Sequence, residues 1–305
     1  MSDVLNALLL GALATGLVML GYWLFISTEG VYLGRRVVIW LYDLYAHRYD
    51  AIKNYQHEYE RLLLARPIMA TIAPLKSPLV LDVATGTGRL PLALLAHEDF
   101  QGHMVGIDLS RRMLSIAAGK LQPFGERVSL IWCPAETLPF EDGAFDVVTC
   151  LEALEFMTAP ERVLGEAVRV LRPGGLLLVT NRIHTRLMPG KIWTSDEARA
   201  LLRSLGVERV EIDVWQADYD QVWGLKDGES AAAGARPLAE ILRCPICREH
   251  RMALHDGVWV CAGCGGKARV GGDGVIELFP LLNRAIASKI EIGDNAGQGK
   301  RKRPA

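Results

Sequence analysis

The sequence has almost no net charge and few cysteines. The first argues against binding nucleic acid through global charge, and the second argues against a fold held together by disulfides. Its 305 residues carry 34 Lys and Arg against 35 Asp and Glu, which leaves a formal net charge of −1. A near-neutral chain offers no global electrostatic basis for binding nucleic acid. Only six cysteines occur, and four stand in two Cys-x-x-Cys pairs, which favours a reducing compartment over a disulfide framework. The length allows one large domain of roughly 150–200 residues and a smaller one.

Charge is missing altogether from residues 5–26, which are almost entirely apolar. As a helix this run would span roughly 33 Å, about the hydrocarbon thickness of a bilayer. A cleaved signal peptide fits poorly because Asp3, with no Lys or Arg, precedes the run. A core helix fits poorly because the run has no polar face. We therefore predict a transmembrane anchor over residues 1–30.

The basic residues near this anchor all follow it: Arg35, Arg36, Arg48 and Lys53. The positive-inside rule then predicts a single-pass membrane protein whose main domain faces the cytoplasm. Residues 31–60 are expected to form interfacial or lid helices. Residues 31–46 mix arginines with apolar residues, so they either lie on the bilayer or pack against the following domain. Both alternatives stay open.

A glycine-rich turn follows an apolar segment in the main domain. Residues 79–83 are typical of a buried strand. Gly86 and Gly88 follow it, and they can adopt positive φ and let a ligand approach the backbone closely. A second apolar strand ends at Asp108, whose carboxylate can accept hydrogen bonds from both hydroxyls of a ribose. Because the carboxyl ends of adjacent parallel strands meet at one edge, these residues predict a nucleoside pocket.

Two residues indicate which nucleoside to expect. A dinucleotide fold would carry a third glycine at position 91 to seat a pyrophosphate, but this chain has Pro91. Asp82 in the first strand would repel a phosphate and suits an ammonium group. Adenosine joined to a cationic amino acid is S-adenosylmethionine (SAM), which is the cofactor we predict. NAD, or a glycine turn without a ligand, stays open as an alternative.

Further motifs follow the glycine turn in order. They are Asp108-Leu109-Ser110 with Ser110 as a helix N-cap, Ala135-Glu136, Phe145-Asp146-Val147-Val148, Leu151-Glu152-Ala153-Leu154-Glu155 and Leu171-Arg172-Pro173-Gly174-Gly175. With them, residues 42–225 resemble the class I SAM-dependent methyltransferases, especially the branch of ubiquinone and menaquinone C-methyltransferases. The resemblance implies an α/β fold with a doubly wound, mostly parallel seven-stranded sheet, and a methyltransferase domain over residues 61–226.

The motifs and the resemblance together imply the site residues. Cofactor-binding residues would be Asp82, Ala84, Thr85, Gly86, Gly88, Asp108, Leu109, Ala135, Glu136, Leu151 and the lid residue Tyr49. Pro134 departs from the pattern, because relatives commonly carry an acidic residue there to read the adenine amino group. The catalytic base is unknown. The candidates are Glu155, which follows the strand end nearest the expected methyl group, then His47 and His184, and each also fits a structural role.

The last part of the chain carries a metal-binding pattern. Residues 227–240 are expected to form a linker rich in Gly, Ala and Ser. The four cysteines Cys244, Cys247, Cys261 and Cys264 then have the spacing of a tetrahedral structural Zn²⁺ site. A redox Cys-x-x-Cys is the alternative, but one pair would suffice for it.

Residues 241–280 also carry Asp256-Gly257, Cys264-Gly265 and Asp273-Gly274-Val275-Ile276. With these, they resemble the zinc-ribbon activators of RNA and protein methyltransferases. The resemblance implies that the ribbon stabilises its neighbour in cis, and a generic ribbon is the alternative. Residues 281–305 form a tail that ends in Lys300-Arg301-Lys302-Arg303. We expect this basic end to be solvated, and contact with anionic lipid or RNA is the alternative.

Three hypotheses for function follow. The first is a membrane-tethered methyltransferase acting on a membrane-associated small molecule, such as a quinone precursor or a lipid headgroup, because tethering raises the effective concentration of the acceptor. The second is a methyltransferase for RNA or protein, which the ribbon and the basic tail motivate although nucleic acid is not the expected partner. The third is a membrane-bound SAM-binding scaffold without enzyme activity.

Overall fold

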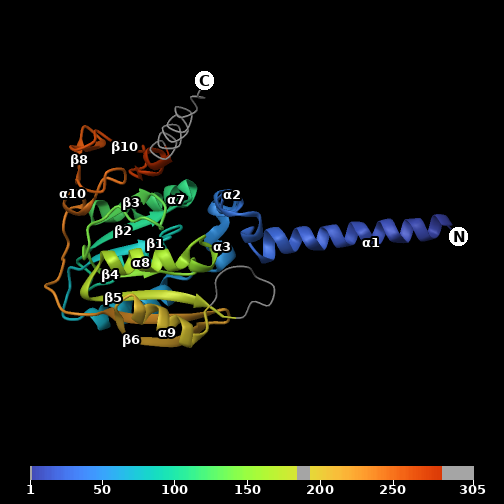
Figure 1. Ribbon diagram of the computed structural model, residues 1–305, viewed down its shortest axis with the longest axis horizontal. Coiled ribbons are helices and arrows are strands. Elements are labelled where there is room, and N and C mark those ends of the chain that lie inside the picture. The colour runs from blue at the N-terminus through green and yellow to red at the C-terminus, as the bar shows by residue number, and fades with distance from the viewer. Residues whose placement is uncertain (1, 184–192, 284–305) are drawn as a thin grey trace, which may run out of the picture.

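A single sheet of eleven strands organises the described part of the protein (Figure 1). The structure is a computed structural model that describes residues 2–183 and 193–283. The strands lie in the order β6-β7-β5-β4-β1-β2-β3-β11-β10-β9-β8. Strands β1 to β5 pair in parallel, while β7 is antiparallel to both β5 and β6. These seven strands are the doubly wound, mostly parallel sheet that the sequence predicts, and that prediction is confirmed.

The elements have the following bounds. The strands are β1 Leu79–Val83, β2 His103–Asp108, β3 Val128–Trp132, β4 Phe145–Cys150, β5 Leu171–Arg182, β6 Val207–Gln216, β7 Tyr219–Lys226, β8 Met252–His255, β9 Val258–Cys261, β10 Lys267–Val270 and β11 Ile276–Glu277. The α-helices are α1 Ser2–Tyr22, α2 Arg35–Tyr45, α3 Tyr49–Lys53, α4 His57–Glu60, α5 Arg66–Ile72, α6 Arg89–Leu95, α7 Arg111–Leu121, α8 Pro160–Val170, α9 Ser195–Ser204 and α10 Leu238–Ile241. The 3₁₀ and π turns are η1 Trp23–Ser27, η2 Val31–Leu33, η3 Ala46–Arg48, η4 Arg61–Ala65, η5 Gln122–Arg127 and η6 Leu154–Phe156.

Helices cover both faces of the parallel strands, so these strands are buried on both sides. Every residue of β1 is buried, which explains its continuous apolar sequence. Leu79, Leu81 and Val83 pack with residues of α8 and α9 on one face. Val80 packs with residues of α6 and α7 on the other face. The two cores hold the carboxyl ends of β1, β2 and β4 side by side at one edge.

The first helix leaves this domain, and none of its described residues belongs to the two hydrophobic core clusters. A candidate membrane span covers Asp3–Ser27, with mean hydropathy 2.0 and none of its hydropathy window buried. Figure 1 shows α1 projecting from the molecule, with α2 and α3 between it and the sheet. At its foot the chain is packed: Thr28 is fully buried, and a Cβ on Gly30 (φ 76°) would lie 2.8 Å from the Leu41 side chain. The foot of α1 is therefore continuous with the helices that follow.

The ribbon extends the sheet. Strand β11 pairs in parallel with β3, and β10, β9 and β8 continue antiparallel from it. Trp259 and Leu242 of this region belong to the same hydrophobic core as Phe140 of the main domain. A small separate module was expected from residues 241–280. The structure instead joins them to the edge of the sheet, because their apolar residues have no core of sufficient size of their own.

The segment expected as a linker, residues 227–240, is likewise fastened to the sheet. Its Ala233 and Gly234 N–H groups donate to the Asp146 carboxylate at 2.8 and 2.9 Å. Asp146 is buried in β4 and also accepts from Leu79 N and from Arg172 Nε. A buried carboxylate with four donors orders the segment that it holds. The last turn of this segment is α10.

Candidate functional site

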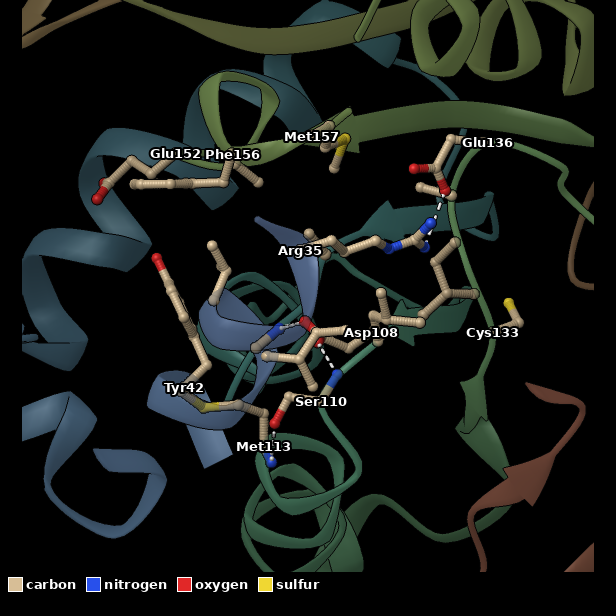
Figure 2. A pocket seen from close by; sticks show the side chains of 18 of the residues that line it. Arg35, Tyr42, Asp108, Ser110, Met113, Cys133, Glu136, Glu152, Phe156 and Met157 are labelled. Carbon is tan, nitrogen blue, oxygen red and sulfur yellow. Dashed lines mark hydrogen bonds and ion pairs between the residues drawn. The ribbon is translucent and has the colours of Figure 1, made fainter. Parts of the chain in front are cut away.

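A pocket opens at the carboxyl edge of the sheet, under α2 (Figure 2). It contains most of the residues that the sequence assigns to SAM: Tyr49, Ala84, Gly86, Asp108, Leu109, Ala135, Glu136 and Leu151. Asp82 and Thr85 line a smaller adjoining hollow, which Tyr49, Ala84, Gly86 and Leu151 also line. The structure thus brings these residues together around one connected site. Their role in binding stays a prediction.

Asp108 lies at the centre of the pocket. Its Oδ2 accepts from Gly86 N at 2.8 Å and its Oδ1 from Ser110 N at 2.7 Å. Ser110 is the N-cap of α7, with its side chain accepting from Met113 N, as the sequence predicts. Burial raises the pKa of Asp108 to about 6, although the backbone donors oppose the rise. Because a carboxylate has about four acceptor sites, the two used here leave capacity for ribose hydroxyls.

Asp82 occupies the neighbouring strand end. It is 3% exposed, and Thr149 Oγ1 donates to its Oδ1 at 2.7 Å. Burial raises the pKa of Asp82 to about 6, with the Asp108 carboxylate adding to the rise. A buried carboxylate without a bound cation is costly, and an ammonium group placed beside it would offset that cost. The site therefore favours a ligand that is cationic at this end.

Backbone conformation at the strand ends is unusual. Gly86 has φ +54° with open space where a Cβ would stand, so it leaves room for a ligand. Ala84 after β1 and Glu152 after β4 also have positive φ, at 58° and 50°. Such strain in non-glycine residues is concentrated at functional sites.

Gly88 differs from the other predicted cofactor residues. A Cβ there would lie 3.1 Å from Leu121 and 3.2 Å from Ala117, both in α7. Among the residues described, it lines neither hollow. We therefore assign Gly88 to the close packing of α6 on α7, below the pocket.

Helices α2 and α3 form a lid over the pocket. Asp43 of α2 accepts from Ser110 Oγ at 2.5 Å, and Asp50 of α3 accepts from Thr87 Oγ1 at 2.5 Å. Figure 2 shows Arg35 reaching across the opening to Glu136, at 3.1 Å. The two acidic residues attach the lid directly to the glycine turn and to the start of α7.

A charged cluster closes the side of the pocket near α3. Glu152 Oε1 accepts from Arg89 Nη1 at 2.6 Å, and its Oε2 lies 3.7 Å from Lys53 Nζ. Tyr42 stands opposite, and burial, followed by the Glu29 carboxylate, raises the pKa of its hydroxyl. Glu152 is part of the motif that follows β4, but it is not among the binding or catalytic residues predicted from the sequence. Its position just after a buried strand was the available signal.

Two of the three catalytic candidates named from the sequence, Glu155 and His47, lie outside this lining. Glu155 is buried on η6 and accepts from the Tyr219 hydroxyl, and burial raises its pKa. His47 is exposed on η3. Neither is among the described residues that line the two hollows. His184 falls outside the described residues.

The four cysteines of the ribbon converge. The sulfur atoms of Cys244, Cys247, Cys261 and Cys264 all lie within 4.8 Å of one another. Two of the pairs are separated by 3.5 and 3.6 Å. Tetrahedral coordination at a Zn–S distance of about 2.3 Å requires sulfurs about 3.8 Å apart, so the cluster fits Zn²⁺. No cysteine of the cluster is among the described residues that line the pocket.

Residues 81–179 match the methyltransferase domain family. The match runs from β1 into β5 and covers about a third of the chain. The Thermus thermophilus demethylmenaquinone methyltransferase is 45% identical to the chain over 101 residues, which are 33% of this chain and 45% of that protein. The ubiquinone/menaquinone biosynthesis C-methyltransferase UbiE of Roseobacter denitrificans is 33% identical over 153 residues, which are 50% and 60% of the two chains. The chain thus spans about half the length of these curated relatives.

Solved structures share the fold of the methyltransferase domain. The [4+2]-cyclase SpnF aligns with TM-score 0.54 at 19% identity, over 63% of this chain and 96% of its own. A chain from the complex of the Haloferax volcanii Trm112 methyltransferase activator with a methyltransferase aligns with TM-score 0.50 at 20% identity, over 62% and 97%. These likenesses confirm the class I fold, and the cyclase shows that the fold also hosts other chemistry.

Proposed function

We propose that the protein is a membrane-tethered, SAM-dependent methyltransferase that methylates a ring carbon of a quinone precursor. The observation that carries the proposal is that Gly86 and Asp108 line a pocket beneath a lid, while Asp82 lines the adjoining hollow that Gly86 shares. The acceptor class rests on relatives whose names specify quinone methylation. A lipid headgroup, the other small-molecule acceptor considered, has no such support.

Each residue has a defined part in the proposed binding. Asp108 accepts from the ribose hydroxyls, Asp82 pairs with the ammonium group, and Leu109 and Ala135 border the adenine. SAM supplies a methyl group already activated by its sulfonium, so the protein mainly positions the two partners. The ring carbon takes the methyl group as the sulfonium leaves as a thioether, and the ring loses a proton.

The Glu152 carboxylate is placed to accept a hydrogen bond from an acceptor hydroxyl. It lines the pocket and is held by Arg89 and Lys53, so its direction is fixed before the acceptor arrives. Hydrogen bonding to a quinol hydroxyl increases electron density on the ring carbon that attacks. We assign Glu152 this role in place of Glu155, which lies behind the pocket wall.

The localisation is part of the same proposal. The apolar helix is long enough to cross a bilayer, and its packed foot argues against a removable leader. With Arg35, Arg36, Arg48 and Lys53 following it, the methyltransferase domain would face the cytoplasm. The ribbon braces the far edge of the sheet, which favours an in-cis structural role over recognition of RNA or protein.

The test is SAM binding and methyl transfer by the full-length protein in lipid nanodiscs. Calorimetry with SAM is combined with mass spectrometry of reduced demethylmenaquinone after incubation with methyl-deuterated SAM. Asp108→Ala should weaken SAM binding by roughly 5- to 150-fold, because buried hydroxyl and N–H groups lose their acceptor, at about 1–3 kcal/mol. Asp213→Ala, at an exposed position of β6, is the matched control.

Two results would contradict the proposal. Unchanged SAM affinity in Asp108→Ala would remove the cofactor site. Tight SAM binding without a methylated product would favour the scaffold hypothesis.

A further inference from the structure

A second hollow lies at the foot of α1, on the outer side of the lid. It is lined from η1, α2 and α3, and its apolar walls include Phe25, Ile26, Leu41 and Ile52. Three of these are substantially exposed: Phe25 by 40%, Ile26 by 48% and Ile52 by 61%. Apolar side chains that line an open hollow indicate a site for an apolar ligand. We call this hollow the tail groove.

The tail groove adjoins the candidate SAM pocket. Tyr42 and Tyr49 line both, so these two side chains stand between the groove and the site. Their rings lie 5.9 Å apart, and Tyr42 also contacts Phe156 on the pocket side at 6.0 Å. Figure 2 shows Tyr42 beside Glu152 and Phe156, the part of the pocket where the acceptor would react. The two rings are in contact at this separation, so a ligand that reaches Glu152 from the groove would have to displace them.

The charges in the groove lining are already paired. Glu29 Oε2 accepts from the Tyr42 hydroxyl at 2.6 Å. Lys53 Nζ lies 3.7 Å from Glu152, on the pocket side. An apolar chain can therefore enter the groove without burying an unpaired charge, and burial of an unpaired charge would oppose binding.

The groove begins where the candidate membrane span ends. Phe25 and Ile26 belong both to the groove and to the span Asp3–Ser27. With α1 in a bilayer, the groove would open at the level of the membrane surface. A molecule dissolved in the bilayer could then enter it without crossing water.

We propose that the tail groove binds the apolar tail of the methyl acceptor, so that an acceptor with a long hydrocarbon chain enters from the bilayer, displaces the rings of Tyr42 and Tyr49, and places its own ring in the pocket beside Glu152. This rests on the proposed function for the identity of the ring, while the groove itself rests on residues 25–53. Burial of the chain contributes binding energy in proportion to its buried area. Tail length therefore governs the affinity of the acceptor.

The test compares two acceptors with the full-length protein in nanodiscs. The probes are reduced demethylmenaquinone with a two-unit isoprenoid tail and a naphthoquinol that has no tail. Ile52→Glu places a charge in the groove, and Ile52→Trp fills it. Each should raise the KM for the tailed acceptor at least tenfold and leave the KM for the tail-less naphthoquinol and the affinity for SAM unchanged. Leu63→Glu, which replaces an apolar residue 50% exposed outside the groove, is the control and should change none of them.

Equilibrium binding of the same two compounds in their oxidised form, without SAM, separates this proposal from the proposed function. Tail-dependent binding that Ile52→Glu abolishes supports the groove even where no methyl transfer occurs, and that combination would refute only the proposed function. Binding that does not depend on the tail, or an Ile52→Glu variant that binds the tailed compound like the wild type, would overturn the groove.

Discussion

SAM affinity should rise with pH between pH 5 and pH 7, and the two buried carboxyls of the pocket give the reason. Burial raises the pKa of both Asp82 and Asp108 to about 6 in the free protein. An ammonium beside Asp82 and ribose hydroxyls donating to Asp108 would favour the ionised forms and lower both pKa values in the complex. Below pH 6, binding must therefore release protons, and acid weakens it.

The magnitude follows from the pKa values. Each pH unit below 6 lowers the ionised fraction of one carboxyl by about tenfold, or about 1.4 kcal/mol. Between pH 7 and pH 5, SAM affinity should fall by about 10-fold if one carboxyl is linked to binding and up to about 100-fold if both are. The assay is calorimetric titration from pH 5 to 7.5 at constant ionic strength, below the range in which an α-amino group with a pKa of about 7.7–8.0 deprotonates.

Asp82→Asn separates the two groups, because an amide oxygen still accepts from Thr149. SAM binding by the variant should release one proton fewer, so its affinity should change less steeply with pH.

Folding stability should depend on pH in the opposite direction. A carboxyl whose pKa is raised in the folded state binds its proton more tightly when the protein is folded, so its contribution to stability falls as pH rises from about 4 to 6. Without SAM, Asp82→Asn should therefore gain stability relative to the wild type over that window. A wild-type SAM affinity that is flat or falls as pH rises would refute the reasoning.

Two further predictions concern the ends of the chain. Cys261→Ser should lose the metal and destabilise the whole domain in one cooperative transition, by on the order of 3–6 kcal/mol if the apolar burial of Trp259 and Leu242 is lost. Zinc content and thermal unfolding measure these effects, and a separate unfolding step at low temperature that leaves SAM binding intact would contradict the prediction. Deleting residues 1–27 should give a soluble protein that still binds SAM. Because Phe25 and Ile26 are removed, its KM for the acceptor should no longer depend on the length of the acceptor's tail. An insoluble product, or one that does not bind SAM, would show that the segment is part of the core.

The sequence predicts well which residues meet at the carboxyl edge of the sheet, because their positions depend on short stretches of sequence. A buried strand followed by a glycine turn positions Asp82 and Gly86 within a few residues, and Asp108 ends the adjacent strand. These relationships need only strand periodicity and the parallel pairing of neighbours. The spacing of the four cysteines is local in the same way. All of these residues converge in the structure as expected.

The acceptor end could not be predicted in this way. After β4 the chain is irregular, with Glu152 at φ 50° and Glu155 on a 3₁₀ turn. Neither helix nor strand periodicity applies there, so the sequence does not indicate which glutamate faces the pocket. Tyr42 reaches the pocket from a helix far away in sequence, and its role depends on how the lid docks. Such non-local packing leaves no pattern within a short window.

The ribbon illustrates how a non-local contact can bear on the site. Arg111, the first residue of α7, is held by both carboxylate oxygens of Asp273 at 2.7 and 2.8 Å and by Glu277 at 3.1 Å. This ion pair lowers the pKa of Asp273. Arg111 directly follows Ser110, whose N–H donates to Asp108. Bidentate pairs fix geometry as well as adding energy. The ribbon therefore braces the start of α7, and through it the Asp108 carboxylate, although no cysteine of the four-cysteine cluster lines the pocket within the described residues.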